Sequence, residues 1–181
     1  MMNISGIILA GGLSSRMGQD KGLLEYKGRA LIEYSIDALK PLCTEIIISS
    51  NNPEYEQYGL RVIADVHEKT GPIGGLYASI CEAKTDDILV CPCDMPFITP
   101  DVFRKILDEK ADSVAAIIKS SSDKLYPTLG YYNKSCLPLI LQQIEHQNYK
   151  LQWLLKELKA KAISIADPKQ LLNFNYPEDI Q

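Results

Sequence analysis

The residues best suited to chemistry lie near the start of the chain, where an apolar run leads into Ala10-Gly11-Gly12 and then into Arg16 and Lys21. Adjacent glycines let a backbone come close to a ligand. Consecutive N–H groups in such a loop can bind phosphate oxygens, and the two cations add the positive charge that a triphosphate needs. This stretch predicts a bound nucleotide, held by its phosphates.

A tight turn after a strand is the alternative, because the spacing matches neither familiar phosphate motif. Gly22 follows Lys21 where an NTP-hydrolysing P-loop has Ser or Thr, and the adjacent Gly11 and Gly12 do not fit G-x-G-x-x-G. The loop alone leaves both interpretations open.

Two aspartates follow predicted strands: Asp94 comes after 88–91, and Asp65 after 60–64. Magnesium prefers one or two carboxylates together with phosphate oxygens and water. Asp94 is therefore predicted to bind Mg²⁺ rather than to cap a helix, since Thr99 fills a cap position better. Asp65 is expected to contact the nucleotide, although aspartates at strand ends are also common in turns.

A second glycine-rich stretch, Gly71-Pro72-Ile73-Gly74-Gly75, opens an amphipathic helix with apolar residues at Ile73, Leu76, Tyr77 and Ile80. Pro72 by itself is an ordinary helix start. Two glycines in the first turn, however, cost about 1 kcal/mol each in helix stability. Their presence favours the close approach of a base or phosphate to the N–H groups of Gly71, Gly74 and Gly75.

Asn173 and Asn175 stand two residues apart near the end of the sequence. In an extended segment they project to the same side, and paired amides suit a heteroaromatic ring with mixed polar edges. A turn before a short helix beginning at Pro177 explains the pattern at least as well. His67 and His146 are the only histidines and show no catalytic spacing, so nucleophilic catalysis through histidine is not expected.

Strands and helices alternate along the chain. This predicts an α/β fold: a three-layer Rossmann-like sandwich with a mainly parallel central sheet, forming one domain over residues 1–181. Ligands bind at the carboxyl ends of strands in such sheets, and these ends hold small, polar or acidic residues, including Ser49 and Asn51. We expect strands at 6–9, 45–49, 60–64, 88–91, 113–118, 128–132 and 162–165, and helices at 31–39 and 99–107 and around 73–80, 137–144 and 151–158.

Composition excludes several classes of protein. At 181 residues and 46% hydrophobic, the chain can bury a full core. A formal net charge of −4 argues against general nucleic-acid binding, yet residues 1–30 hold four basic and two acidic side chains. No apolar run reaches the roughly 18 residues of a membrane span, and no secretory signal is visible. Five cysteines without framework spacing indicate reduced thiols in a cytoplasmic protein.

The residues together resemble the molybdenum cofactor guanylyltransferases (MobA type), within a wider group of nucleotidyltransferases. The resemblance rests on motifs that run from end to end of the chain: Leu9-Ala10-Gly11-Gly12 with Ser14, Arg16-Met17-Gly18, Asp20-Lys21-Gly22, Asp65, Gly71-Pro72-x-Gly74-Gly75-Leu76, Pro92-Cys93-Asp94-Met95-Pro96 and Asn173-x-Asn175-x-Pro177-Glu178-Asp179.

The resemblance implies a fold of the nucleotide-diphospho-sugar transferase type, with nucleotide bound by the N-terminal half and acceptor by the C-terminal half. It implies transfer of GMP from GTP to the phosphate of molybdopterin, which releases pyrophosphate and forms molybdopterin guanine dinucleotide. Mg²⁺ would be the cofactor, and transient contacts with molybdenum-cofactor assembly and acceptor proteins would follow. No nucleic acid or membrane is implied.

The resemblance also implies a role for each matching residue. Leu9, Ala10, Gly11 and Gly12 would hold guanine and phosphates, Arg16 and Lys21 would stabilise charge on the departing pyrophosphate, Asp65 would bind nucleotide, Asp94 would hold Mg²⁺, and Asn173 and Asn175 would lie on the pterin side. Gly12 and Asp94-Met95-Pro96 favour guanine, because cytidine-using relatives look like Leu-Ala-Ala-Gly.

Two departures from the family pattern matter. Family members often have Asn at the end of the second strand, where this chain has Ser49, with Asn51 two residues later. They often have His before the Pro-Thr of the fifth strand, where this chain has Tyr126. A cytidylyltransferase or sugar-1-phosphate nucleotidyltransferase of the same fold, or a catalytically idle GTP-binding module, remain the alternatives.

Overall fold

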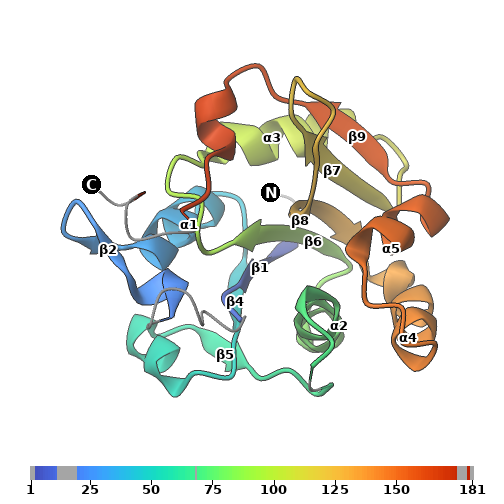
Figure 1. Ribbon diagram of the computed structural model, residues 1–181, viewed down its shortest axis with the longest axis horizontal. Coiled ribbons are helices and arrows are strands. Elements are labelled where there is room, and N and C mark those ends of the chain that lie inside the picture. Colours follow the sequence, from blue (N-terminus) through green and yellow to red (C-terminus); the bar gives the residue numbers. More distant parts are fainter. Residues whose placement is uncertain (1–2, 12–19, 68, 175–178, 180–181) are drawn as a thin grey trace.

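The structure is a computed structural model that describes residues 3–11, 20–67, 69–174 and 179. Its centre is a seven-stranded sheet of order β5-β4-β1-β6-β8-β7-β9 (Figure 1). The strands are β1 (Ile4–Leu9), β4 (Glu45–Ser49), β5 (Arg61–Ile63), β6 (Asp87–Pro92), β7 (Ala115–Lys119), β8 (Leu125–Asn133) and β9 (Lys161–Ser164).

Helices cover both faces of this sheet and make three layers (Figure 1). One face packs against α1 (Leu31–Leu39) and α3 (Pro100–Glu109), and the other against α2 (Pro72–Glu82), α4 (Leu137–Glu145) and α5 (Leu151–Glu157). Side chains alternate along a strand, so Ile8 of β1 joins the first core and Ile7 the second. Burial on both faces explains why the central strands are continuous apolar runs.

The sheet is mainly parallel, as expected, and β8 is the strand that departs from this. It pairs antiparallel with both β6 and β7, whereas β1–β4, β1–β6, β4–β5 and β7–β9 are parallel. Apolar periodicity carries no information on strand direction, so the sequence could not reveal this reversal.

The predicted elements are all present, and two of them, 31–39 and 45–49, have the predicted ends. Elsewhere the ends shift by one to three residues. The prediction missed a small hairpin, β2 (Glu25–Tyr26) with β3 (Arg29–Ala30), and four 3₁₀ turns, η1 (Lys21–Leu23), η2 (Pro53–Tyr58), η3 (Lys134–Cys136) and η4 (Pro168–Leu171). The hairpin turns at Lys27 and Gly28, which both have positive φ. Such turns usually contain Asn-Gly or Asp-Gly, so Lys-Gly gave no clear signal of a hairpin.

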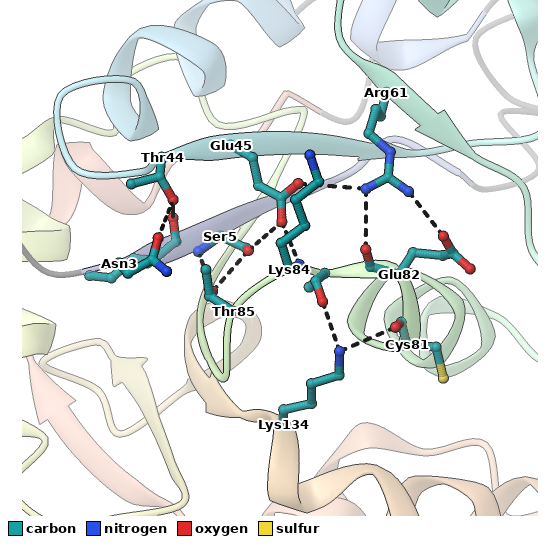
Figure 2. A network of polar contacts seen from close by, with 12 residues as sticks. Asn3, Ser5, Thr44, Glu45, Arg61, Cys81, Glu82, Lys84, Thr85 and Lys134 are labelled. Atoms are coloured by element: carbon teal, nitrogen blue, oxygen red, sulfur yellow. Dashed lines mark hydrogen bonds and ion pairs between the residues drawn. The ribbon is translucent and has the colours of Figure 1, made fainter.

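The amino edge of the sheet carries a polar network made by Ser5, Glu45, Arg61, Glu82 and Thr85, which we call the amino-edge network (Figure 2). Ser5 Oγ donates to Glu45 Oε1 at 2.6 Å, and Ser5 N donates to Thr85 Oγ1 at 2.9 Å. Arg61 lies 2.9 Å from the Glu82 carboxylate and 3.5 Å from that of Glu45. These contacts tie β1, β4, β5 and the end of α2 together.

Among the described residues, none of the helices has the length and apolar character that crossing a membrane requires.

Candidate active site

The carboxyl ends of the parallel strands form one continuous edge. Backbone hydrogen bonds continue past the strand ends, from Ala10 N to Ser49 O at 2.9 Å, from Ser50 N to Ile63 O at 3.0 Å and from Cys93 N to Leu9 O at 3.2 Å. The loops that follow β1, β4, β5 and β6 are therefore fixed relative to one another.

A cavity of about 280 Å³ lies at this edge. Its walls combine the end of β1, the loop after β6, the start of α2, the first part of β8 and the segment before Phe174. The lining residues are Leu9, Ala10, Gly11, Asp20, Lys21, Pro72, Pro92, Cys93, Asp94, Met95, Tyr126, Thr128 and Asn173. Segments from both halves of the chain thus meet around one space.

Lys21 and Asp94 face each other in this cavity, with Nζ 3.4 Å from Oδ2. Their side chains are 27% and 15% exposed. Burial raises the pKa of the Asp94 carboxyl above its ordinary value, and the Lys21 ammonium offsets this only in part. Burial disfavours the charged form of a carboxylate, so a cation that binds beside Asp94 would stabilise its ionised form.

Lys21 is positioned by the residue before it. Asp20 caps η1 by accepting a hydrogen bond from Gly22 N at 3.3 Å, and it accepts another from the hydroxyl of Tyr55 in η2. Tyr55 is fully buried, so this contact anchors the Lys21 turn to the loop after β4. Asp20 had no predicted role of its own, although an aspartate before a short turn is a common cap signal.

Cys93 also lines the cavity. Burial, with the negative charges of Asp94 and Asp20, raises the pKa of its thiol well above the ordinary value. Burial therefore favours the neutral thiol form of Cys93.

Asp65 and Asn51 form a second group beside the cavity. Asn51 Oδ1 accepts a hydrogen bond from Asp65 N at 2.8 Å, and Asp65 Oδ1 accepts one from His67 N at 2.9 Å. Asp65 lies against Gly74 in the first turn of α2, and Pro72 of the same turn lines the cavity. His67 is half-buried, and its ring centre lies 5.7 Å from that of Tyr77.

Gly74 and Gly75 have a packing reason to be glycine. A Cβ at Gly74 would lie 2.5 Å from Asp65 Oδ1, and one at Gly75 would lie 2.5 Å from Ser49 Oγ. Ser49 is 4% exposed, beneath α2, and it does not line the cavity, whereas Asn51 is exposed. The start of α2 thus packs closely on the strand ends. This packing explains the two glycines without a bound ligand.

The far wall of the cavity comes from an irregularity in β8. Gly130 pairs with Ile117 and Tyr126 with the next residue of β7, Ile118, so residues 127–129 bulge out of the register. A Cβ at Gly130 would lie 2.9 Å from Ile117 Cγ2, which leaves glycine as the fitting residue. Pairing of β8 with β6 reaches only to Gly130, and beyond it Tyr126 and Thr128 line the cavity.

The three tyrosines of β8 therefore have different roles. Alternation along a strand accounts for Tyr131 and Tyr132, which are buried in opposite cores. It does not account for Tyr126, which lines the cavity with Lys124 Nζ 4.9 Å from its ring centre. A bulge of this length leaves no clear signal in the sequence.

Asn173 reaches the cavity through the segment that follows β9. Phe174 N donates to the Asp94 carbonyl oxygen at 2.8 Å, and Gln170 Nε2 donates to Thr99 Oγ1 at 3.1 Å. Thr99 is the N-cap residue of α3, as predicted, but its side chain makes no capping hydrogen bond. Three predicted site residues, Gly12, Arg16 and Asn175, lie outside the described residues.

Comparison with known proteins identifies the family of the chain. Residues 6–162 match the model of the MobA-like NTP transferase domain family. The molybdenum cofactor guanylyltransferase of Vibrio vulnificus is 35% identical over 181 residues, covering 97% of this chain and 92% of that protein.

Solved structures share the fold. A protein of Aquifex aeolicus superposes with a TM-score of 0.81 at 28% identity, covering 94% of this chain and 92% of its own. The molybdopterin-guanine dinucleotide biosynthesis protein A of Archaeoglobus fulgidus superposes with a TM-score of 0.82 at 24% identity, covering 97% and 94%. The family match and the full-length relatives show that the chain belongs to the MobA-like NTP transferase family and is a nucleotidyltransferase.

Proposed function

We propose that the protein transfers GMP from GTP to the phosphate of molybdopterin, releasing pyrophosphate and forming molybdopterin guanine dinucleotide. One observation carries the proposal: the Lys21–Asp94 pair lies in a cavity walled on one side by the strand-end loops and on the other by Tyr126, Thr128 and Asn173. The names of the curated relatives, which match over nearly the whole chain, support guanine and molybdopterin as the two substrates.

In this proposal the strand-end side binds GTP. Leu9, Ala10 and Gly11 present backbone close to the base and phosphates, and Lys21 contacts phosphate oxygens. Asp65 and Asn51 lie beside the start of α2, where they are within the same edge and suit the sugar or base. Gly12 and Arg16 belong to the same proposed set.

Asp94 is the residue we propose to hold Mg²⁺. The residues present fit this ion, because the Asp94 carboxylate lines the cavity on the side where the phosphates of GTP would lie. Magnesium needs only one or two carboxylates from a protein when phosphate oxygens and water complete its ligands. When bound, the ion neutralises charge on the triphosphate.

The reaction asks little acid–base chemistry of the protein. A phosphate oxygen of the acceptor attacks the α-phosphorus of GTP, a new P–O bond forms, and the bond to the bridging oxygen breaks as pyrophosphate leaves. The attacking phosphate is already ionised at neutral pH, so no general base is needed. Lys21 stabilises the charge that develops on the leaving group, and the cavity walls align the two substrates.

Pyrophosphate release tests the proposal. The purified protein is mixed with molybdopterin and Mg²⁺, and GTP, CTP and ATP are supplied separately. We expect release with GTP. Release with CTP alone would overturn the assignment of guanine as the base. Release only with a hexose phosphate as acceptor would overturn the assignment of molybdopterin as the acceptor. Confirmed GTP binding without turnover on any acceptor would favour a catalytically idle GTP-binding module.

Two smaller parts of the proposal concern the cell. All five cysteines are free thiols in the structure, which suits a reducing compartment such as the cytoplasm. We also propose transient contacts with proteins that supply molybdopterin and receive the finished cofactor.

A further inference from the structure

Three aromatic rings from three distant segments meet beside the cavity. Tyr26 comes from β2, Phe97 from the loop after β6, and Phe174 from the segment that follows η4. The ring centres of Tyr26 and Phe174 are 5.0 Å apart with an interplanar angle of 89°. Tyr26–Phe97 and Phe97–Phe174 are both 5.9 Å apart, at 80° and 78°. Each pair is edge-to-face, the favourable geometry for aromatic pairs, and we call this set the aromatic triad.

Each ring is close in sequence to a residue that lines the cavity. Phe174 directly follows Asn173, Phe97 comes three residues after Asp94, and Tyr26 five residues after Lys21. The link between Phe174 and Asp94 is also direct, through the 2.8 Å hydrogen bond from Phe174 N to the Asp94 carbonyl. The aromatic triad therefore joins the three segments that carry these residues.

The course of the chain explains why such an anchor is needed. Strand β9 lies at the edge of the sheet, beside β7 and away from β1 and β6. From there the chain crosses back over the α3 side towards α1 and the β2–β3 hairpin (Figure 1). Phe174 is 6% exposed at the end of this crossing, so its ring secures the point where Asn173 enters the cavity.

The strand-end side of the cavity has its own support. Ala10, Ser50 and Cys93 are held by backbone hydrogen bonds between neighbouring strands, and Asp65 N is held by Asn51. The Lys21 turn is held by Asp20, which accepts hydrogen bonds from Gly22 N and from the Tyr55 hydroxyl. None of these contacts passes through the aromatic triad. Loosening the triad should therefore move the Asn173 segment relative to Asp94 and leave the nucleotide side in place.

We propose that the aromatic triad positions the acceptor, and that Phe174 is a positioning residue which sets the distance between the Asn173 segment and Asp94. This inference rests on the proposed function, because it takes the Asn173 side of the cavity as the acceptor side. It assigns to Phe174 an effect on acceptor binding and turnover, with no effect on GTP binding.

The test compares two identical substitutions. Phe174→Leu removes an edge-to-face ring from the aromatic triad, and Phe103→Leu removes a ring from α3 that is fully buried in the core on the same face of the sheet. We expect Phe174→Leu to raise the KM for molybdopterin by about 10- to 100-fold, since small misplacements cost this much. GTP affinity, measured by calorimetry without acceptor, should stay within about twofold, as should both KM values in Phe103→Leu.

Substitutions of Tyr26 test whether the change in the KM for molybdopterin depends on the whole aromatic triad. Tyr26→Leu should raise the KM for molybdopterin as Phe174→Leu does, while Tyr26→Phe keeps the ring and should behave as the unmodified protein. Equilibrium binding of molybdopterin to each variant gives a readout that does not depend on turnover. Thermal unfolding of all four variants separates positioning from simple loss of stability.

The outcomes separate the two proposals. Equal effects of Phe174→Leu and Phe103→Leu, or a rise in the KM for GTP alone, would overturn the role of the aromatic triad. If the unmodified protein releases pyrophosphate from GTP only with another acceptor, the proposed function fails, and the KM of that acceptor in the same two variants decides on the triad.

Discussion

The two edges of the central sheet use charged residues in opposite ways. At the amino edge, Glu45 accepts hydrogen bonds from Ser5 Oγ and from Lys84 N, both at 2.6 Å, and Arg61 bridges it to Glu82 (Figure 2). At the carboxyl edge, Lys21 and Asp94 approach only to 3.4 Å, across a cavity of about 280 Å³. The first set is compact and joins secondary-structure elements, and the second lines a cavity.

The two edges differ in how far their charged and polar side chains are paired with other groups of the chain. Polar residues at a strand end do not by themselves mark a site, because the amino edge is as rich in them as the carboxyl edge. Ser5 and Thr85 are buried and hydrogen-bonded within the chain. A buried carboxylate such as Asp94, whose pKa burial raises despite a lysine nearby, marks the edge that suits a ligand.

The largest expected effect is a loss of activity on substitution at the carboxyl edge. Asp94→Asn should lower kcat by about 100- to 1,000-fold, the usual cost of removing one charge-stabilising group from an active site. Thermal unfolding should be unchanged or shifted upward, since an amide is easier to bury than a carboxylate. A variant that keeps its rate would remove Asp94 from the proposed metal site.

Thr85→Val probes the other edge. The change keeps the shape of the side chain but removes the acceptor for Ser5 N and the donor to the Asp87 carbonyl. We expect a loss of about 1–3 kcal/mol in the free energy of unfolding, the cost of leaving a buried polar group unpaired. Urea titration measures it, and kcat should not change. A fall in kcat with normal stability would mean that the two edges are coupled.

Glu45→Gln adds a pH dependence to the comparison. Burial alone would raise the pKa of Glu45, but hydrogen bonds from Ser5 and Lys84 N, with the charges of Lys84 and Arg61, hold it below its ordinary value. A lowered pKa contributes stability above the unfolded value of about 4.3, and this is lost as the pH falls through the folded value. We expect Glu45→Gln to be about 1 kcal/mol less stable at pH 7 and equal to the unmodified protein near pH 3. A constant difference would contradict this.

The smallest effect concerns the start of α2. Gly75→Ala should destabilise through its contact with Ser49 Oγ, whereas Ser49→Ala combined with Gly75→Ala removes that contact, because the next atom, Ser49 Cβ, is 3.7 Å away. Replacing glycine in a helix should then leave the double variant up to about 1 kcal/mol more stable than the unmodified protein. Calorimetric titration with GTP completes the test. Normal GTP affinity in the double variant would mean that Gly75 is needed only for packing. Lost affinity would mean that Gly75 is needed for the approach of the ligand.

Much of the architecture could be predicted from the sequence, because it depends on periodicity. Helix Leu31–Leu39 and strand Glu45–Ser49 have the expected ends, since most of their apolar residues are buried in the two cores. Strands β1 and β6 begin earlier than expected, at Ile4 and Asp87, because residues near their starts take part in contacts between elements at the amino edge. Such contacts cannot be seen in one segment of sequence.

The site could be predicted where it follows strand ends, and less where it depends on pairing. Leu9, Lys21, Asp94 and Asn173 do line one cavity, as the motifs suggested. Tyr126 and Thr128 were not assigned to it, because their position results from the direction of β8 and from its bulge.

The bulge in β8 has a consequence for how the protein can change. Register is set on both sides of residues 127–129, by Gly130 opposite Ile117 and by Tyr126 opposite Ile118. Substitutions at Thr128 can therefore reshape one wall of the cavity without causing a slip among the seven strands. In the proposed function this wall faces the second substrate, so its selectivity can change by mutation at little cost to folding, while the loops proposed to bind the nucleotide keep their structure.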